Sequence, residues 1–342
     1  MTYFIILIIG LGIYAFAQLA NVVQLSSTLK GAPEEEVTDK DNRFNARMMM
    51  GMLIFILGFF VWQIKEYSHT ILPESASEHG VEIDTLWDFN MWIVILVFVV
   101  VNMVLFYFAS KYYFKKGNRA TFFAHSTKLE LIWTIIPAIF LSVIIIYGLK
   151  VWTDITGPVE SKNGVIIELY AKQFDWTARY AGKDNKLGAT NYKLITDENP
   201  LALDKNDPAS SDDILTRGEF HLPVGKEAYF SFRSRDVIHS AYMPHFRAQM
   251  NCVPGMETQF HFKPTITTAE MRKKLNNEKF DYVLLCNKIC GATHFSMQMS
   301  IIVETEAEYK AWLAKQKEFA SKDTPAAPAA PADTTKPKMA LK

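Results

Sequence analysis

The chain has 342 residues, of which 49% are apolar and 21% are charged, and its formal net charge at pH 7 is zero. A balanced charge gives no indication of a nucleic-acid-binding protein, and we expect no nucleic-acid partner. The composition fits either a large soluble domain or a membrane protein with a soluble part, so the distribution of the apolar residues decides between these two classes.

Four long apolar segments lie in the first half of the chain. Each is nearly free of charge and about as long as the roughly 20 residues that a helix needs to cross a bilayer core. No comparable segment follows residue 152. We therefore predict four transmembrane helices, at residues 3–23, 48–64, 90–110 and 131–152.

Basic residues concentrate in two of the three connecting loops. Four lysines and arginines separate the first two segments and five separate the last two, whereas the middle loop carries Lys65 among six acidic residues. Loops rich in lysine and arginine face the cytoplasm. This distribution predicts that the N-terminus, the middle loop and the polar domain after residue 152 all lie outside.

The first segment could instead be a cleaved signal peptide, because YAFAQ at residues 14–18 resembles a small-residue cleavage site. Cleavage would leave three spans and carry the polar domain into the cytoplasm, against the lysine distribution. The segment also lacks a basic stretch before it. We therefore favour a retained helix.

The polar region that follows reads as β-structure. Short alternating segments recur at residues 165–171, 227–233, 257–263, 281–286 and 298–304, separated by glycine, proline, asparagine and aspartate. This pattern predicts a sandwich or Greek-key barrel. A helix is expected from residue 305 to about 319, and the Pro/Ala-rich tail, residues 321–342, is expected to be disordered.

One short segment, CNKICGATHFSM at residues 286–297, gathers residue types that bind soft metals. Its spacing also fits one face of a buried helix, but the segment lies between two predicted strands and contains a glycine. A disulfide would leave the histidine and the methionine unexplained, and thioether is no usual zinc ligand. Thiolate, thioether and imidazole together favour copper, with candidate ligands Cys286, Cys290, His294 and Met297.

The number of cysteines bears on the kind of copper site. A mononuclear blue-copper site needs one cysteine, whereas two thiolates can bridge two copper ions. Such a dinuclear site needs one imidazole for each copper ion, and this segment contains only one histidine. Another part of the chain must supply the second. The histidines left in the polar domain are His221, His239, His245 and His261.

Three motifs in this order resemble subunit II of the haem-copper cytochrome c oxidases: DVIHS, VPGM and CNKICGATHFSM. Upstream, HSTKLELIWTIIPAIFLSVII is similar to that subunit's second membrane helix and AKQFDWTARY to its aromatic segment. The resemblance covers residues 90–304 approximately. It implies a cupredoxin-like Greek-key domain with a dinuclear CuA centre, on the periplasmic side of a bacterial inner membrane.

The resemblance also implies a ligand set. Two cysteines would bridge the copper ions, two histidines would each bind one ion, and a methionine and a backbone carbonyl would be the weak ligands. The residues concerned are Cys286 and Cys290, His239 and His294, Met297, and Lys288 through its carbonyl. The family usually has glutamate at position 288, where the carboxylate helps hold magnesium, so that magnesium contact is not expected here.

Three further positions match functional residues of the family. Phe174 stands where the electron-accepting tryptophan is expected, and Trp176 matches the second aromatic residue; both could instead simply pack a hydrophobic surface. Glu130 matches a glutamate at the cytoplasmic mouth of a proton pathway, or is an interfacial carboxylate without that role. No C-x-x-C-H motif occurs, so we expect no covalent haem.

The resemblance divides the chain into four parts: two extra N-terminal helices with a cytoplasmic loop (1–66), the two-helix hairpin of subunit II with its outer loop (67–152), the copper domain (153–320) and the tail (321–342). The implied function is electron entry from a c-type cytochrome to haem in subunit I, which reduces oxygen and translocates protons. The extra helices would contact other oxidase subunits or a neighbouring respiratory complex. The alternatives are a CuA-free subunit of a quinol oxidase and a purely structural membrane subunit.

Overall fold

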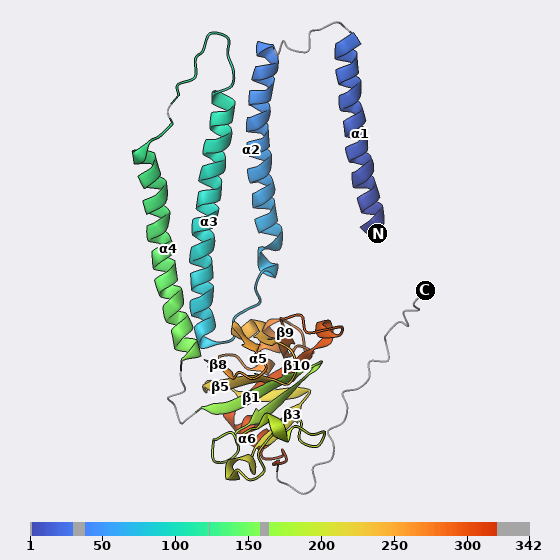
Figure 1. The fold of residues 1–342 in the computed structure, drawn as a ribbon, viewed down its shortest axis with the longest axis vertical. Helices are drawn as coiled ribbons and strands as arrows, with labels where there is room; N and C mark the ends of the chain where they lie inside the picture. Colours follow the sequence, from blue (N-terminus) through green and yellow to red (C-terminus); the bar gives the residue numbers. More distant parts are fainter. Residues whose placement is uncertain (1, 30–37, 123, 158–163, 320–342) are drawn as a thin grey trace. The chain divides into compact units, whose positions relative to one another are not determined.

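The computed structural model describes residues 2–29, 38–122, 124–157 and 164–319, with the side chains of residues 2–9 and 27 left out (Figure 1). The tail that we predicted to be disordered lies outside these residues. All four predicted apolar segments lie in long helices, which are α1 Thr2–Leu29, α2 Asp39–Tyr67, α3 Glu78–Lys111 and α4 Thr127–Thr156.

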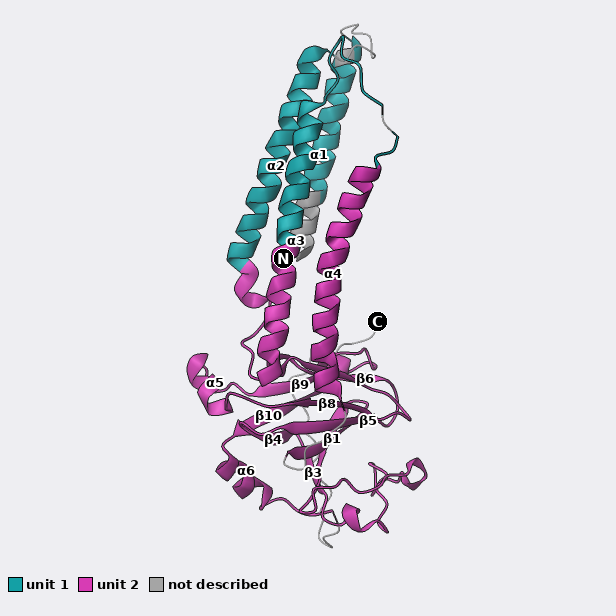
Figure 2. Ribbon diagram, turned by 90° about the vertical axis from the view of Figure 1, so that its left-hand side faces the viewer, with its two compact units in different colours: residues 1–66, 94–126 teal, residues 67–93, 127–342 magenta. Residues whose placement is uncertain are grey.

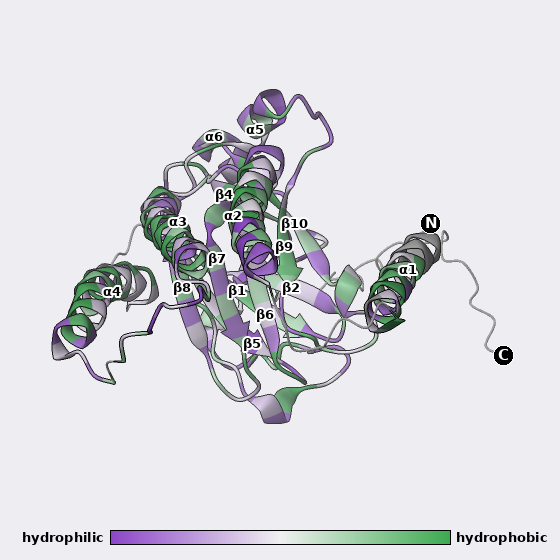
Figure 3. Ribbon diagram, turned by 90° about the horizontal axis from the view of Figure 1, so that it is seen from above, coloured by the Kyte–Doolittle hydropathy of each residue, from purple (hydrophilic) through white to green (hydrophobic). Residues whose placement is uncertain are grey.

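Three helices of the described chain are long and apolar enough to cross a membrane: Asp39–Thr70, Glu78–Lys111 and Thr127–Thr156. Hydrophobic residues recur along α3 and α4 (Figure 3), and many of their side chains, such as those of Leu96 and Ile146, are exposed. Such helices bury their apolar side chains in lipid instead of in a protein core. Three of the four spans are thus supported, and the span through α1 stays a prediction.

The chain forms two compact units, residues 1–66 with 94–126 and residues 67–93 with 127–342 (Figure 2). In the first unit, α2 packs against the later part of α3, where the rings of Phe60 and Phe98 lie 4.7 Å apart. The second unit contains the N-terminal part of α3, the whole of α4 and the polar domain. The division into four parts that the resemblance implied stays a prediction.

The polar domain is a sandwich of two five-stranded sheets, as predicted from the alternating segments. One sheet has the order β3-β2-β1-β5-β8, with β1 Val165–Lys172, β2 Asp175–Tyr180, β3 Ile214–Arg217, β5 Ala228–Ser234 and β8 Thr258–Phe262. The other has the order β4-β10-β9-β6-β7, with β4 Glu219–Pro223, β6 His239–Met243, β7 Ala248–Cys252, β9 Tyr282–Cys286 and β10 Gln298–Glu304.

Each sheet contains one parallel pair, β1 with β5 and β4 with β10, and its other strand pairs are antiparallel. The inner faces carry large apolar side chains, including the fully buried Trp176, Phe220, Phe232 and Tyr282. Because side chains alternate between the two faces of a strand, these residues meet between the sheets and form one core.

Short helices close the gaps between strands. They are η1 Ser68–Thr70, η2 Tyr192–Leu194, η3 Pro208–Ser210, η4 Pro244–Phe246, η5 His294–Ser296, α5 Thr268–Lys274 and α6 Glu306–Leu313. Thr305 and Glu308 form a capping box at the start of α6. Our predicted helix reaching residue 319 is wrong at its end, because the chain leaves α6 after Leu313 and Glu318 pairs with Ile214 as an isolated bridge.

A buried ion-pair network holds the long connection between β2 and β3 against the first sheet. Arg179 pairs with Glu168 and, at 2.9 Å, with Asp213, and all three side chains are at most 3% exposed. Arg179 also donates to the carbonyl of Gly188. A buried charge needs such partners because an uncompensated one is strongly destabilising.

Candidate metal centre

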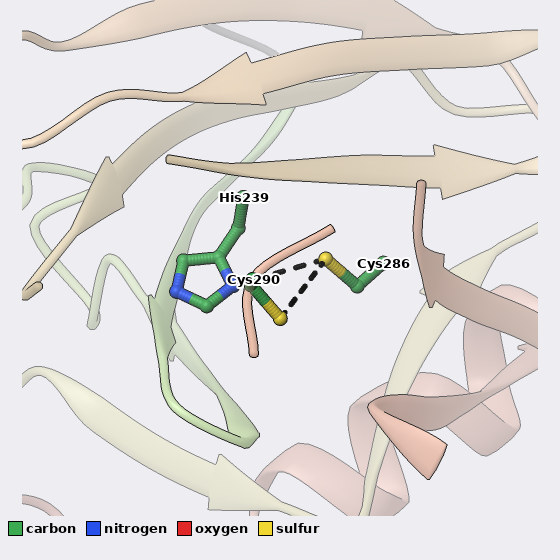
Figure 4. A group of neighbouring side chains, drawn as sticks. All are labelled: His239, Cys286 and Cys290. Atoms are coloured by element: carbon green, nitrogen blue, oxygen red, sulfur yellow. Dashed lines mark hydrogen bonds between the residues drawn. The ribbon is translucent and has the colours of Figure 1, made fainter. Parts of the chain in front are cut away.

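Three potential metal ligands converge at one end of the second sheet. His239 is the first residue of β6, Cys286 the last residue of neighbouring β9, and Cys290 follows in the next loop. Their ligand atoms all lie within 4.8 Å of one another. The two sulfur atoms are 3.9 Å apart and Sγ of Cys286 is 3.7 Å from Nδ1 of His239 (Figure 4).

The strand register explains why these side chains meet. Ala241 of β6 lies opposite Cys286 of β9, and His239 is two residues from Ala241 on the same face. Side chains at positions i and i+2 of a strand point to the same side of a sheet. The histidine and the cysteine therefore both point into the core, where His239 is fully buried and Cys286 is 8% exposed.

The remaining three predicted ligands surround this group. Nδ1 of His294 lies 3.5 Å and Sδ of Met297 lies 3.8 Å from Sγ of Cys290. The carbonyl oxygen of Lys288 lies 3.2 Å from Sγ of Cys286, while the lysine side chain is exposed. All six residues thus lie together, although their roles as ligands stay a prediction.

The loop that carries these residues has a fixed shape. The N–H of Cys286 donates to the carbonyl of Met297 at 3.0 Å, so the loop closes on itself. Gly291 adopts φ +143°, and a Cβ there would lie 2.7 Å from Cζ of Phe174. Glycine is therefore required for the loop to approach the phenylalanine ring.

Two residues outside the loop, Gln173 and Asp236, connect the loop to His239. Gln173, between β1 and β2, donates from Nε2 to the carbonyl of Cys290 at 2.5 Å and from its backbone N–H to Asp236 at 2.7 Å. The other carboxylate oxygen of Asp236 lies 2.8 Å from Nε2 of His239. Our sequence interpretation missed this brace, for which the only signal is an aspartate three residues before a candidate ligand.

Hydrogen bonding fixes the proton on His239. Partial burial would raise the pKa of Asp236, but hydrogen bonds from Gln173, His239 and Val237 outweigh it and lower that pKa. An ionised carboxylate can only accept, so Nε2 of His239 donates to Asp236, and Nδ1 is the ring nitrogen that faces Sγ of Cys286. Burial, together with the neighbouring Cys286, raises the pKa of the Cys290 thiol to about 11.

Of the three other predicted functional residues, two lie beside the ligand group and one lies on α4. The ring of Trp176 is fully buried with its centroid 6.3 Å from that of His239, while Phe174 is half-buried against Gly291. Glu130 lies in the first turn of α4 and is exposed. The third cysteine, Cys252, is fully buried, and burial raises the pKa of its thiol to about 12.

Comparison with known proteins identifies the family of this chain. Residues 60–151 match the family model "Cytochrome C oxidase subunit II, transmembrane domain". The chain is 35% identical over 240 residues to the alternative cytochrome c oxidase subunit 2 of Bradyrhizobium diazoefficiens, covering 70% of this chain and 81% of that protein. This chain belongs to the cytochrome c oxidase subunit II family.

Other relatives are more distant. Cytochrome c oxidase subunit 2 of Thermostichus vulcanus is 26% identical over 294 residues, covering 79% of this chain and 85% of that protein. The crystal structure of the periplasmic domain of subunit II from Bradyrhizobium japonicum has 21% identity and covers 46% of this chain and 95% of that one, with a TM-score of 0.31, too low to support a structural argument. The chain is thus a membrane-bound subunit of a haem-copper terminal oxidase.

Proposed function

We propose that this subunit II carries a dinuclear CuA centre and is the electron-entry subunit of its oxidase. The observation that carries the proposal is the convergence of the two buried thiols of Cys286 and Cys290 with two imidazole Nδ1 atoms, from His239 and His294. Soft sulfur donors with imidazole select copper over magnesium or calcium.

The donor set fits two copper ions better than the alternatives. The sulfur atoms of Cys286 and Cys290 are 3.9 Å apart, well beyond the roughly 2.05 Å of a disulfide. Met297 and the carbonyl of Lys288 supply one weak donor beside each thiol. A structural zinc site would leave the thioether without a purpose.

The chain's own residues would keep the ligands in place during electron transfer. A dinuclear copper centre delocalises one electron over two ions, which lowers the reorganisation that each transfer requires. Asp236 holds the ring of His239, and Gln173 holds the loop at Cys290. Such outer contacts orient ligands and tune the metal.

The proposal extends to the partners. Electrons would arrive from a c-type cytochrome and leave to haem in subunit I, where oxygen is reduced. Phe174 is half-buried beside the loop of Cys290, and Trp176 lies beside His239, so we assign both to the path of electron entry. Glu130, exposed on α4, would face subunit I at the cytoplasmic entrance of a proton pathway.

We further propose that the β-sandwich is a cupredoxin-like Greek-key domain on the periplasmic side of a bacterial inner membrane. The lysine-rich loops would be cytoplasmic. No covalent haem is expected in this chain. The two N-terminal helices would contact other oxidase subunits or a neighbouring respiratory complex.

Copper analysis with electron paramagnetic resonance of the purified oxidase tests the proposal. We expect two copper ions in subunit II and hyperfine coupling to two equivalent copper nuclei. Cys252→Ser is the matched control, since this thiol is equally buried but lies outside the ligand group, and it should keep both ions. A one-copper hyperfine pattern or zinc at full occupancy would refute the proposal.

A further inference from the structure

The segment that enters α3 is hydrogen-bonded to both sheets of the sandwich, at η4 between β6 and β7 and at the residues that follow β8. The N–H of Ala76 donates to the carbonyl of His245 at 2.7 Å, and the N–H of Thr265 donates to the carbonyl of Ala76 at 2.9 Å. Glu78 donates from its N–H to Lys263 at 3.0 Å. We call residues 73–80 the strap. Its backbone pairing joins the N-terminal part of α3 to the sandwich within one compact unit (Figure 2).

Arg247 lies where the strap and the sandwich meet. It follows η4, at the turn between β6 and β7, and has φ +52°. Left-handed backbone is unfavourable for a non-glycine residue and persists only where surrounding contacts compensate for it. Glycine would adopt this conformation without that cost, so the presence of arginine points to a role for its side chain.

The guanidinium group of Arg247 contacts both the helix and the strap. It bonds both carboxylate oxygens of Asp84 on α3, at 2.6 and 2.9 Å. It also donates to the carbonyl of Pro73 in the strap at 2.6 Å and to that of Pro244 at 2.7 Å. A paired arginine and carboxylate fix orientation as well as distance, and the arginine side chain is only 7% exposed.

The first turn of α3 lies close beneath this side chain. A Cβ at Gly80 would come within 2.6 Å of Oγ of Ser77 and within 3.2 Å of Cγ of Arg247. The glycine therefore permits the helix to approach the arginine stem and the strap together. Arg247 is thus enclosed by α3, the strap and η4, with its charge neutralised by Asp84.

A short, regular element connects this contact to the candidate metal centre. Arg247 follows η4 at one end of β6, and His239 is the first residue at the other end. Five strand residues span about 13 Å at the usual rise of ~3.3 Å per residue. A paired strand inside a sheet is stiff, so a displacement at one end of β6 moves the other end.

We infer that Arg247 is a positioning residue that fixes the sandwich on the N-terminal part of α3, and with it the group formed by His239, Cys286 and Cys290. The first half of this inference concerns the fold alone. The second half rests on the proposed copper centre, because the distance from that centre to an acceptor in subunit I would then depend on this contact.

Hydrogen–deuterium exchange of the purified oxidase tests the first half without reference to copper. Arg247→Gly removes the side chain but keeps a residue suited to the left-handed turn, so the sandwich should stay folded. We expect exchange at the amides of Ala76, Glu78 and Thr265 to become about tenfold faster, the effect of losing a hydrogen bond to a charged group. Asp84→Asn should act in the same direction, and the double variant should add little to Arg247→Gly.

Lys263→Gln is the matched control. Lys263 pairs with Glu78 at the same junction, but this pair is solvent-exposed, so its loss should leave strap exchange unchanged. Unchanged strap exchange in Arg247→Gly would overturn the inference, as would an equal effect in Lys263→Gln. Arg247→Lys keeps the charge without the paired geometry and should restore little protection.

Transient electron-transfer measurements test the second half. We expect Arg247→Gly to keep the copper spectrum of the unaltered oxidase while slowing electron transfer out of the centre several-fold. A loosened strap with an unchanged transfer rate would overturn the positioning of the metal group. Absence of copper from the unaltered oxidase would instead refute the proposed function, while the exchange experiment would still decide the contact between Arg247 and α3.

Discussion

The side-chain amide of Gln173 donates a hydrogen bond of 2.5 Å to the backbone carbonyl of Cys290. Through its backbone N–H, the same residue binds Asp236, which in turn contacts His239. One residue between β1 and β2 therefore connects both segments that carry the candidate ligands. Loss of this connection should affect the metal without disturbing the core.

We expect Gln173→Ala to release copper to a chelator faster, with affinity lowered about 10- to 100-fold, the usual effect of removing an outer contact of a metal ligand. Copper content and visible absorbance over time provide the measurement. Gln249→Ala, an exposed glutamine on β7, is the control and should behave as the unaltered protein. Equal copper release in both variants would contradict the role of the brace.

Gly291→Ala should destabilise the copper loop. The added Cβ would lie 2.7 and 2.8 Å from two carbons of the Phe174 ring, and overpacking of this kind costs about 1–3 kcal/mol. Thermal unfolding of the oxidase, followed through the copper absorbance, provides the measurement. Phe174→Leu in the same chain should restore part of the lost stability, and a double variant no better than Gly291→Ala would argue against this contact.

Met297→Leu should retain copper but change the reduction potential of the centre and slow transfer. Cys290→Ser should lose the dinuclear site. A weak thioether tunes a centre, whereas thiolates and imidazoles hold it together. Redox titration with metal analysis distinguishes the two variants. Equal copper loss in both would contradict this order of importance.

Lys288→Ala should leave the copper spectrum nearly unchanged. Only the backbone carbonyl of Lys288 approaches Cys286, at 3.2 Å, and its side chain is exposed. The ammonium group is therefore free to pair with a carboxylate of subunit I, in which case subunit retention and turnover would fall. A changed copper spectrum would contradict the carbonyl assignment, and unchanged assembly and turnover would dismiss the ion pair.

The pKa values of two histidines in the β-sandwich domain, His261 and His245, should be shifted in opposite directions. A hydrogen bond at 2.7 Å to the carboxylate of Glu227 raises the pKa of His261 despite partial burial. Burial, and secondarily the charge of Arg247, lowers the pKa of His245. Hydrogen–deuterium exchange at the imidazole C2 position, read by mass spectrometry, should therefore report a higher pKa for His261 than for His245.

The sign for stability follows from the raised pKa of His261. Its folded state binds the proton more tightly, so the pair with Glu227 contributes fully below the ordinary histidine pKa of about 6.5. This contribution is lost as the pH rises through the raised value. Glu227→Gln should lower the unfolding temperature in mildly acidic buffer and have no effect at alkaline pH; the opposite order would refute the assignment.

The ligand cluster was predictable because most of it is local in sequence. Cys286, Cys290, His294 and Met297 lie within twelve residues, and their chemistry names the metal class without a structure. The five alternating segments also agree with the observed strands β1, β5, β8, β9 and β10 to within one residue at every end. Alternation of apolar and polar residues shows directly which face of a strand is buried.

Residues whose partners are distant in sequence were not predictable. Asp213 follows another aspartate in the connection between β2 and β3, a pattern that gives no sign of burial, yet it is fully buried against Arg179. Trp176 was expected either to take part in electron entry or to pack a hydrophobic surface, and nothing local indicated that its ring would be fully buried beside His239. Nothing local to Arg247 indicates a left-handed backbone or a contact with Asp84, because both depend on how the strap and α3 pack against the sandwich.

Gln173 and Cys290 are 117 positions apart in the chain, and the parallel pairing of β4 with β10 joins two other distant segments. No part of the nascent polypeptide shorter than almost the whole outer domain can therefore form the pocket. On the proposed function, copper binding would therefore follow closure of both sheets, because only then do Cys286 and Cys290 reach their buried positions.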